Sequence, residues 1–467
     1  MVMKAWIGLL FLLVGMAPAR EATDRPNVIL IYLDDSGYGD YSYHGNPVIE
    51  TPCIDRMAAG GVDFTQFYVT SPACSASRYS LLTGRYPARS GFGTWVIGPD
   101  SKPHLRTEEV TIAEALKQAG YGTGMFGKWH LGHPNAKNQM SADTLPLAHG
   151  FDEWLGTNVS HDYADAQLLQ SDPAGKEPIV GYRMIAKNLP SDAAASTSLT
   201  KRYTDAAVDF IGRHKEKPFF TYIAYNQPHL GLYVDEAYRG KSRRGLLGDV
   251  MAEVDDSIAR ILKTIEAAGL RDNTLVIFSS DNGPWIRFQN TAKDPKYGEA
   301  RMHIGYAQPF RDGKGSNWEG GHRVPGIFYW PGVIKPKRQL EPASTLDVLP
   351  TVLALCGGKS DRQADGRDIR ALLAPDRFSQ PVKSFSLLYS GAANEANAYR
   401  EGPWKIHTAL ISQTGDSYGF RATPEQPLLF QVEQDLGERY DRAAEQQEQV
   451  KGMLERMKTL EQSMRVP

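Results

Sequence analysis

The sequence lacks several features that would direct the interpretation elsewhere. After its first residues it contains no apolar run long enough to cross a membrane. Its 52 Lys and Arg residues balance 54 Asp and Glu residues, and the net charge of −2 excludes a global basic field for nucleic acid. Three cysteines permit at most one bridge, which excludes a disulfide scaffold. The remainder has an ordinary globular composition without repeats or low-complexity tracts.

The one apolar run lies at the N-terminus. Lys4 precedes the run at 5–14, and small residues follow at 17–19. This order is typical of a secretory signal peptide, so we predict one over residues 1–19 and a secreted or periplasmic protein. A buried N-terminal helix is the less favoured interpretation, because polar residues from Arg20 onward break the apolar pattern.

The three cysteines receive different interpretations. Cys53 and Cys356 are predicted to be buried, inert thiols, which is the commoner role of a free cysteine. Cys74 lies among small and polar residues, with Arg78 four positions later. A thiol held among polar groups is usually one that reacts, binds metal or is modified. An exported protein also meets oxidising conditions, in which such a thiol needs a defined role.

Apolar, β-branched segments alternate with helical patterns along the chain. The pattern predicts buried strands at 28–33, before Lys128, at 219–225 and at 274–280. Amphipathic spacing predicts helices at 109–119, 200–214 and 248–268. Strands alternating with helices indicate a layered α/β fold with a largely parallel sheet.

Each predicted strand ends in side chains that can do chemistry. Each end taken alone is compatible with a solvated turn, but ligands of such sheets bind at the carboxyl ends of the strands, so four polar ends favour one shared site. The residues at these ends are Asp34 and Asp35, then Lys128 and His130, then His229, then Asp281 and Asn282.

The residue types at these ends indicate a metal and an oxyanion. The three aspartates and Asn282 offer only oxygen ligands, which suit Ca²⁺ or Mg²⁺, and the absence of histidine from the set favours calcium over zinc. Cys74 and Arg78 lie where a helix is predicted to begin, with Ser75 or Ser77 as its cap. A helix N-terminus, an arginine and nearby lysine and histidine together suit a tetrahedral oxyanion.

These residues match a known family. The chain resembles the type I, formylglycine-dependent sulfatases of the alkaline-phosphatase-like superfamily, whose signature C-x-P-S-R-x-x-L-L-T-G-R stands here as CSASRYSLLTGR, residues 74–85. The resemblance also covers NVILIYLDDSGYGD, GKWHLG, SDNG, GKGSNWEGGHRVP and DLGERYD. The stretch LGTNVSHDY is similar to the branch of arylsulfatase A and N-acetylgalactosamine-6-sulfatase.

The resemblance implies a role for each site residue. Cys74 would be oxidised to formylglycine by a maturation enzyme, and the hydrate of that aldehyde would be the nucleophile and a metal ligand. The remaining calcium ligands would be Asp34, Asp35, Asp281 and Asn282, and the other catalytic residues Arg78, Lys128, His130, His229 and Lys314. Of these, Lys128, His229 and Lys314 would also bind substrate, together with Ser160.

Three features depart from the family or need a second interpretation. Ala76 stands where the signature prefers proline, which leaves the maturation enzyme open. The segment 284–311 is longer than in the animal enzymes, and either shapes the substrate pocket or forms a solvated basic loop. It holds Arg287, Arg301, His303 and Arg311. The sequon at Asn158 is interpreted as part of the site and not as a glycan acceptor, since a glycan would block Ser160.

The resemblance implies a sulfuric ester hydrolase acting on a sulfated saccharide or an aryl sulfate. Two alternatives are a phosphatase or phosphonate-ester hydrolase of the same superfamily and a non-catalytic relative that binds sulfated glycans. Asn282 after Asp281 disfavours the first, and the filled catalytic positions disfavour the second. A purely structural secreted protein would leave the polar strand ends unexplained.

The expected architecture is an α/β/α sandwich with a large mixed, mostly parallel sheet and a small C-terminal antiparallel sheet. We predict a catalytic domain over 25–373 and an α+β subdomain over 374–467. The subdomain is expected to contain short strands and a polar helix over 438–464.

Overall fold

A computed structural model describes residues 25–464 except 94–95, 99–100, 102, 133–139, 165, 177–178, 287–303, 391–395 and 414–419. The predicted signal peptide at 1–19 therefore lies outside the described residues, as do Arg287, Arg301 and His303. Among the described helices, none is sufficiently long and apolar to pass through a bilayer.

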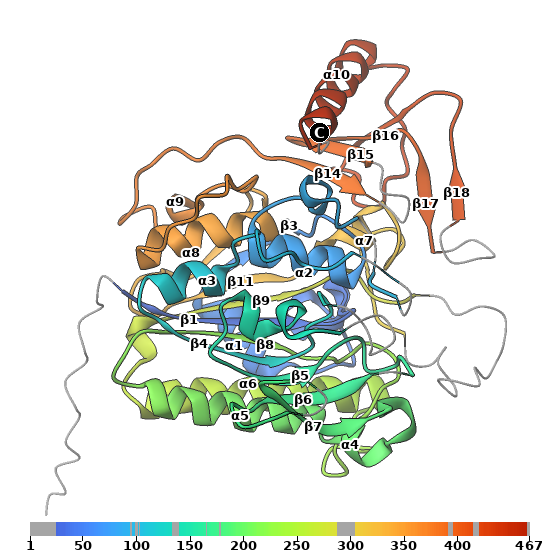
Figure 1. Cartoon of the computed structure of the whole chain (residues 1–467). Helices are drawn as coiled ribbons and strands as arrows, with labels where there is room; N and C mark the ends of the chain where they lie inside the picture. The colour runs from blue at the N-terminus through green and yellow to red at the C-terminus, as the bar shows by residue number, and fades with distance from the viewer. Residues whose placement is uncertain are drawn as a thin grey trace, which may run out of the picture.

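A ten-stranded mixed sheet forms the centre of the molecule (Figure 1). Five parallel strands lie side by side in its middle, and antiparallel pairings occur towards both ends. In spatial order the strands are β12 (Lys337–Gln339), β2 (Val62–Phe64), β11 (Gly326–Tyr329), β9 (Thr274–Ser280), β1 (Asn27–Leu33), β8 (Phe219–Ala224), β4 (Gly122–Gly127), β5 (Glu153–Thr157), β6 (Gln167–Ser171) and β7 (Tyr182–Lys187).

Helices cover both faces of this sheet. β1 is buried throughout, and its alternate side chains enter different cores: Leu30 packs with one helical layer and Ile31 with the other. The first layer contains α2 (Cys74–Thr83), α3 (Ile112–Gln118) and α8 (Val348–Cys356), and the second contains α1 (Pro52–Gly60), α5 (Leu199–His214) and α6 (Leu246–Ala267). The three layers are visible in Figure 1, and they confirm the predicted sandwich.

The predicted strands and helices of the large domain agree with the structure to within about three residues, as expected for helix ends. α3 begins late relative to the pattern because Thr111 is its N-cap and forms a capping box with Glu114. Burial of both faces explains why the strands read as continuous apolar runs.

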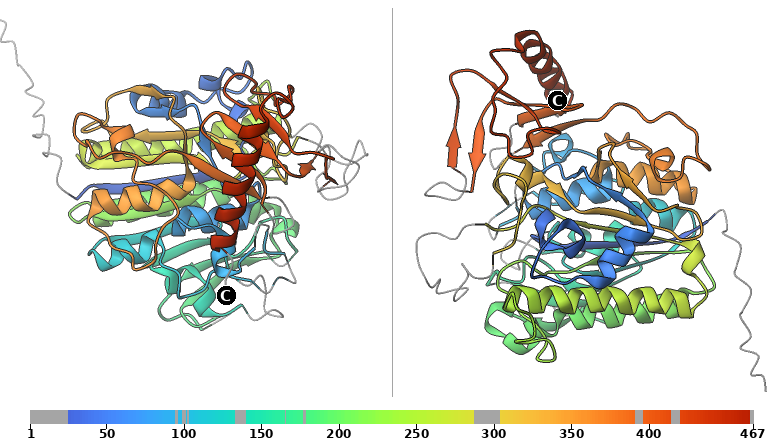
Figure 2. Two further views of the ribbon diagram at one scale, coloured as in Figure 1. Left: turned by 90° about the horizontal axis from the view of Figure 1, so that it is seen from above. Right: turned by 180° about the vertical axis from the view of Figure 1, so that it is seen from behind.

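A smaller unit packs on one side of the large domain (Figure 2). Its antiparallel sheet has the order β14 (Ser386–Ser390), β15 (Ala396–Glu401), β16 (Trp404–His407) and β19 (Leu428–Gln431), and α10 (Gln447–Met464) packs on it. β17 (Leu410–Ser412) and β18 (Phe420–Ala422) form a separate hairpin. The boundary at residue 373 remains a prediction.

The predicted helix over 438–464 begins too early. α10 starts only at Gln447, nine residues later than expected. Glu438 instead has a left-handed backbone, with φ of 50°, and its buried carboxylate binds Lys405 and His407. Polar composition alone did not distinguish this buried carboxylate from the solvated face of a helix.

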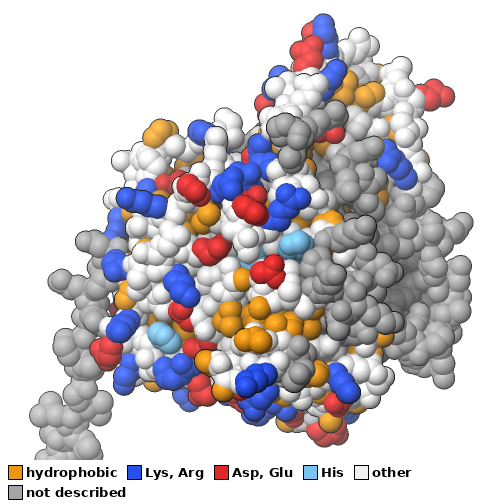
Figure 3. All heavy atoms as spheres, viewed as in Figure 1, with side chains coloured by type: hydrophobic (Ala, Val, Ile, Leu, Met, Phe, Trp, Pro, Cys, Tyr) orange, Lys and Arg blue, Asp and Glu red, His pale blue; other side chains and the backbone are white. Residues whose placement is uncertain are grey.

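Short elements connect the two units. β10 (Arg323–Val324), β3 (Phe67–Tyr68) and β13 (Ala343–Ser344) form a three-stranded sheet, and α7 (Glu319–His322) precedes β10. All three cysteines are free and buried, so the described chain contains no disulfide. Acidic and basic side chains are interspersed over the face shown in Figure 3, in agreement with the absence of a global basic field.

Candidate active site

The predicted polar residues meet at one edge of the central sheet. Parallel pairing aligns the last residues of the strands: Leu33 of β1 is opposite Ser280 of β9, and Gly127 of β4 is opposite Ala224 of β8. The residues that follow these strand ends therefore share one edge. This placement confirms the expectation that the strand ends meet, and the chemical role of each residue remains a prediction.

α2 brings Cys74 to this edge. The helix begins at Cys74, after an extended N-cap at Ala73. The predicted capping by Ser75 or Ser77 is wrong, because both residues lie inside the helix and their hydroxyls are committed elsewhere. Ser75 Oγ accepts a hydrogen bond from the N–H of Ile97 at 2.9 Å, and Ser77 Oγ lies 3.0 Å from the hydroxyl of Tyr32.

The Cys74 thiol lies between opposite charges. Its Sγ is 3.3 Å from Asp34 Oδ1 and 3.5 Å from Lys314 Nζ, and the residue is only 1% exposed. Burial and the charge of Asp34 raise the pKa of the thiol well above its ordinary value. The unmodified side chain is therefore a neutral thiol at physiological pH and a poor nucleophile.

Asp34 and Asp281 have different nearest cations, and Arg78 Nη2 also lies 3.6 Å from Asp34 Oδ1. Lys128 Nζ is 2.5 Å from Asp34 Oδ2, while Arg78 donates through Nε and Nη2 to Asp281 Oδ2, at 3.1 and 2.7 Å. Burial opposes ionisation of Asp34, but Lys128 and the other nearby cations hold its pKa well below the usual range. Burial and the charge of Asp34 raise the pKa of Asp281 to about 7. Arg78 therefore offsets the cost of burying the Asp281 charge only in part.

Asp35 is the centre of a second set of contacts. Lys314 Nζ lies 2.7 Å from Asp35 Oδ1, and Asn282 Nδ2 donates to the same oxygen at 2.7 Å. The N–H of Asp35 donates to Asp281 Oδ1 at 3.0 Å, with the backbone in the left-handed region at φ of 62°. His229 Nε2 lies 3.5 Å from Asp35 Oδ2. The lysine thus bridges the Asp35 carboxylate and the Cys74 thiol.

Each of the two predicted histidines has one ring nitrogen fixed by a backbone carbonyl. His229 Nδ1 binds the Leu230 oxygen, and His130 Nε2 lies 2.9 Å from the Ile97 oxygen. A carbonyl only accepts, so these nitrogens carry the hydrogen, and His229 Nε2 and His130 Nδ1 are the atoms that can gain a proton. Burial lowers the pKa of both rings, further assisted by Lys314 for His229 and by Lys128 for His130.

Ser160 also reaches the site, and two neighbours that the sequence analysis missed come with it. Ser160 Oγ lies 3.4 Å from Lys128 Nζ. The His161 ring lies 5.7 Å from the His229 ring, and Asp162 Oδ1 lies 4.0 Å from His229 Nδ1. Their adjacency to Ser160 was the available signal. Asn158 is 1% exposed and accepts from the N–H of Gln167, which agrees with reading its sequon as part of the site.

The site residues fit a hard divalent cation. Ligand atoms of Asp34, Asp35, Cys74 and His229 all lie within 4.8 Å of one another. This group includes His229 and does not include Asp281, unlike the predicted ligand set. We favour the predicted oxygen donors, because Asn282 Oδ1 is buried without a hydrogen-bond partner among the described residues and Asp281 is incompletely compensated. Both features are resolved by a cation beside carboxylate and amide oxygens.

The chain is similar to known proteins over most of its length, and these similarities identify its family. A family model described as Sulfatase matches residues 26–358. The chain is 35% identical to arylsulfatase A of Bos taurus over 453 residues, which cover 92% of this chain and 86% of that protein. It is 34% identical to N-acetylgalactosamine-6-sulfatase of Rattus norvegicus over 465 residues, or 90% and 82% of the two chains. This chain belongs to the sulfatase family.

Solved structures agree with this assignment. A sulfatase from Pseudoalteromonas sp. matches with a TM-score of 0.78 at 26% identity, over 93% of this sulfatase and 89% of that chain. The phosphonate monoester hydrolase of Agrobacterium radiobacter matches with a TM-score of 0.61 at 17% identity, over 94% and 96% of the two chains, and shows the common fold alone. The sulfatase therefore has the alkaline-phosphatase-like fold, and its family relationship makes it a sulfuric ester hydrolase.

The segment 284–311 lies partly outside the described residues. Of its basic residues only Arg311 is described, and its guanidinium lies 3.7 Å from the Trp318 ring centroid and donates to the Glu438 oxygen at 3.1 Å. Arg311 thus contacts the C-terminal subdomain. Trp285, which the sequence analysis did not select, lies beside the site, with Lys314 Nζ 5.0 Å from its ring centroid.

Proposed function

We propose that this sulfatase removes sulfate from sulfated saccharides by means of a formylglycine made from Cys74. The observation that carries the proposal is the position of Cys74 at the first residue of α2, between the carboxylate of Asp34 and the ammonium of Lys314. Because burial raises the pKa of the unmodified thiol, it would be a poor nucleophile, and the proposed activity therefore requires the modified side chain.

Four groups would hold calcium: the carboxylates of Asp34, Asp35 and Asp281 and the amide oxygen of Asn282, with the modified residue 74 completing the set. When bound, calcium supplies a Lewis acid and the formylglycine hydrate supplies a hydroxyl nucleophile. The three carboxylates already face Arg78, Lys128 and Lys314, so the negative charge of a sulfate ester would offset one of the two positive charges that a divalent cation adds.

The chain's own cations would bind the sulfate group. Lys128, Lys314 and Arg78 are buried and held by carboxylates, so they are already oriented before a substrate arrives. Such preorganised charges stabilise a developing anion more than mobile ones do. Ser160 Oγ, 3.4 Å from Lys128 Nζ, would add a hydroxyl contact to the substrate.

The histidines would move the protons. His229 Nε2 faces the Asp35 side of the site and would carry the proton given to the leaving alcohol, with Lys314 as a second donor. His130 Nδ1 is buried without a hydrogen-bond partner among the described residues, so it would accept the proton that must leave residue 74 during release of sulfate. Two fixed tautomers thus separate the acid and base roles.

Maturation and export complete the proposal. Ala76 lies in the first turn of α2, where proline is also tolerated because its missing N–H has no carbonyl partner within the helix. Alanine at this position therefore leaves the fold unchanged. The replacement of proline by alanine would instead affect recognition by the maturation enzyme. The N-terminal residues would direct export to the periplasm or the exterior.

The test is sulfate release from a panel of defined sulfated saccharides and an aryl sulfate, each matched with the corresponding phosphate ester. The protein is first checked by mass spectrometry for the aldehyde at position 74. We expect sulfate release in preference to phosphate release, and none from Cys74→Ala. Preference for phosphate would instead favour the phosphatase alternative, and tight saccharide binding without sulfate release would favour a non-catalytic relative.

A further inference from the structure

The segment that contains Lys314 is held from outside the large domain. Ser412 and Gln413 of the C-terminal subdomain both bind the carboxylate of Asp312, Ser412 through its hydroxyl and Gln413 through its backbone N–H at 3.3 Å. The Asn317 amide donates to the Ala409 oxygen at 2.7 Å and accepts from the N–H of Ile411 at 3.0 Å. Residues 409–413, which include β17, therefore bind both ends of the segment 312–317.

The Gln413 side chain binds directly behind the lysine. Its Nε2 donates to the Lys314 carbonyl at 2.8 Å, and its Oε1 accepts from the N–H of Ile286 at 2.7 Å. One partner only accepts and the other only donates, so the amide has a single favourable orientation. The N–H of Lys314 donates to Pro284 at 2.9 Å, and Gln413 is 4% exposed. The amide thus joins the segment after Asn282 to the Lys314 segment.

The position of this backbone decides where the lysine ammonium lies. Lys314 Nζ lies 2.7 Å from Asp35 Oδ1 and 3.5 Å from Cys74 Sγ. The N–H of Gly315 also donates to the Pro72 oxygen at 2.9 Å, two residues before Cys74. Lysine has a flexible four-carbon stem, so its charge is placed accurately only if its backbone is fixed.

We propose that Gln413 is a positioning residue that acts through Lys314, so that the C-terminal subdomain completes the active site. The inference rests on the proposed function, in which Lys314 binds sulfate and shares in proton transfer. The Gln413 side chain binds two backbone groups, the N–H of Ile286 and the carbonyl of Lys314.

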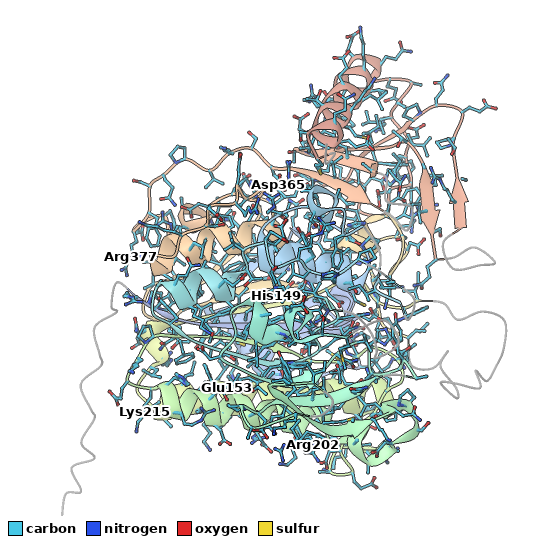
Figure 4. All side chains as sticks on the ribbon, viewed as in Figure 1. His149, Glu153, Arg202, Lys215, Asp365 and Arg377 are labelled. Atoms are coloured by element: carbon cyan, nitrogen blue, oxygen red, sulfur yellow. The ribbon has the colours of Figure 1, made fainter. Side chains whose placement is uncertain are left out.

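The subdomain has other attachments that do not involve Gln413. Lys405 lies 3.0 Å from both Glu319 and Glu438 at the interface. Asp365, labelled in Figure 4 where the large domain meets the subdomain, binds Arg89, which donates to the Ser463 oxygen at 2.8 Å. A substitution at Gln413 therefore leaves the subdomain docked.

The test is a double-mutant cycle of Gln413→Met and Lys314→Met in aldehyde-containing enzyme. Methionine keeps the shape of glutamine and removes both hydrogen bonds. Gln413→Met should lower kcat/KM by about tenfold to a hundredfold, the range expected for displacing a reacting group by about 1 Å. In the Lys314→Met background the same change should have almost no effect, because the group that it positions is gone.

Gln431→Met is the matched control, since Gln431 lies on β19 of the same subdomain and its side chain accepts a hydrogen bond from the N–H of Gln434, away from Lys314. Its kcat/KM should equal that of the wild type. An equal loss for Gln413→Met with and without Lys314 would overturn the inference while leaving the sulfatase proposal intact. A crystal structure of Gln413→Met gives a readout without activity: the Lys314 ammonium should move from Asp35, and an unchanged position would also overturn it.

Discussion

Two buried charge clusters of this protein have similar composition and opposite character. The site cluster contains Asp34, Asp35, Asp281, Arg78, Lys128 and Lys314, and the interface cluster contains Glu319, Glu438, Lys405, His407 and Arg400. Both mix carboxylates with cations, and every member is at most 3% exposed. In both clusters every carboxylate oxygen accepts a hydrogen bond, so the difference lies in the pKa values of the carboxylates.

In the interface cluster every carboxylate oxygen accepts a hydrogen bond. Glu319 accepts from Lys405 and Tyr389 at one oxygen and from Tyr68 at the other. Glu438 accepts from His407 at one oxygen and from the N–H of Glu319 at the other. Burial opposes ionisation, but Lys405 holds the pKa of both glutamates below the ordinary value. Both carboxylates of this cluster are thus stabilised in their charged form, and the cluster holds the two units together.

In the site cluster the surroundings shift the pKa values of two carboxylates in opposite directions. The pKa of Asp281 is raised to about 7 while that of Asp34 is lowered, and Asn282 Oδ1 is buried without a hydrogen-bond partner in the described part of the chain. Titratable groups whose pKa values are pushed apart by their surroundings gather at functional sites. The comparison teaches that opposite pKa shifts among neighbouring carboxylates, and not burial or the presence of opposite charges, distinguish the candidate catalytic cluster from the structural one.

Cys74→Ala should give the largest effect on activity and little effect on stability. The thiol makes only long contacts, at 3.3 and 3.5 Å, but its modified form would be the nucleophile. Loss of sulfate release by about 10⁴-fold or more is expected, as for other nucleophile deletions, with a thermal midpoint close to that of the wild type. A large fall in the thermal midpoint with retained turnover would mean that Cys74 has a structural role and not a catalytic one.

Removal of calcium should give the second-largest loss of activity, because it affects the site cluster and not the interface cluster. Dialysis against a chelator should lower sulfate release by about a hundredfold or more, because a Lewis acid contributes several kcal/mol to such reactions. Added calcium should restore the activity and raise the thermal midpoint, since it binds only the folded site. Asp281→Asn serves as the control and should weaken the response to calcium. Full activity in metal-free protein would contradict the cation fit.

Lys405→Met should act on stability instead. It leaves two buried glutamates without their shared cation, and breaking a buried ion pair costs about 3–5 kcal/mol. We expect a lower free energy of unfolding by denaturant, with kcat per folded molecule reduced far less than by Cys74→Ala. Lys335→Met, which removes an exposed pair with Asp376, is the control and should change stability little.

Acid should weaken the interface cluster by a smaller amount. Both glutamates have a folded pKa below the ordinary 4.5. Their contribution to stability is therefore present above that value and is lost as the pH falls below it, at up to about 1.4 kcal/mol per pH unit for each group. Unfolding free energies across this range should show a steeper decline for the wild type than for Lys405→Met. Equal slopes would mean that Lys405 does not depress these pKa values.

The sequence predicted the layered fold because strands buried on both faces have a continuous apolar pattern that ends abruptly. Asp34 and Asp281 were recognisable because they follow such strands directly. Gln413 and Asp162 were not, because the contacts that matter are made across the tertiary fold, with no periodic pattern around them. Glu438 was assigned to a helix for the same reason: only the folded structure shows that its charge is buried against Lys405.

The most direct measurement relates sulfate release to the chemical state of residue 74. Preparations of the wild-type protein with different degrees of maturation are analysed by mass spectrometry for the aldehyde fraction, and kcat is measured on the same samples with calcium present. The account predicts that kcat rises in proportion to the aldehyde fraction and extrapolates to zero when only cysteine is present. Turnover that does not depend on the aldehyde fraction would contradict it.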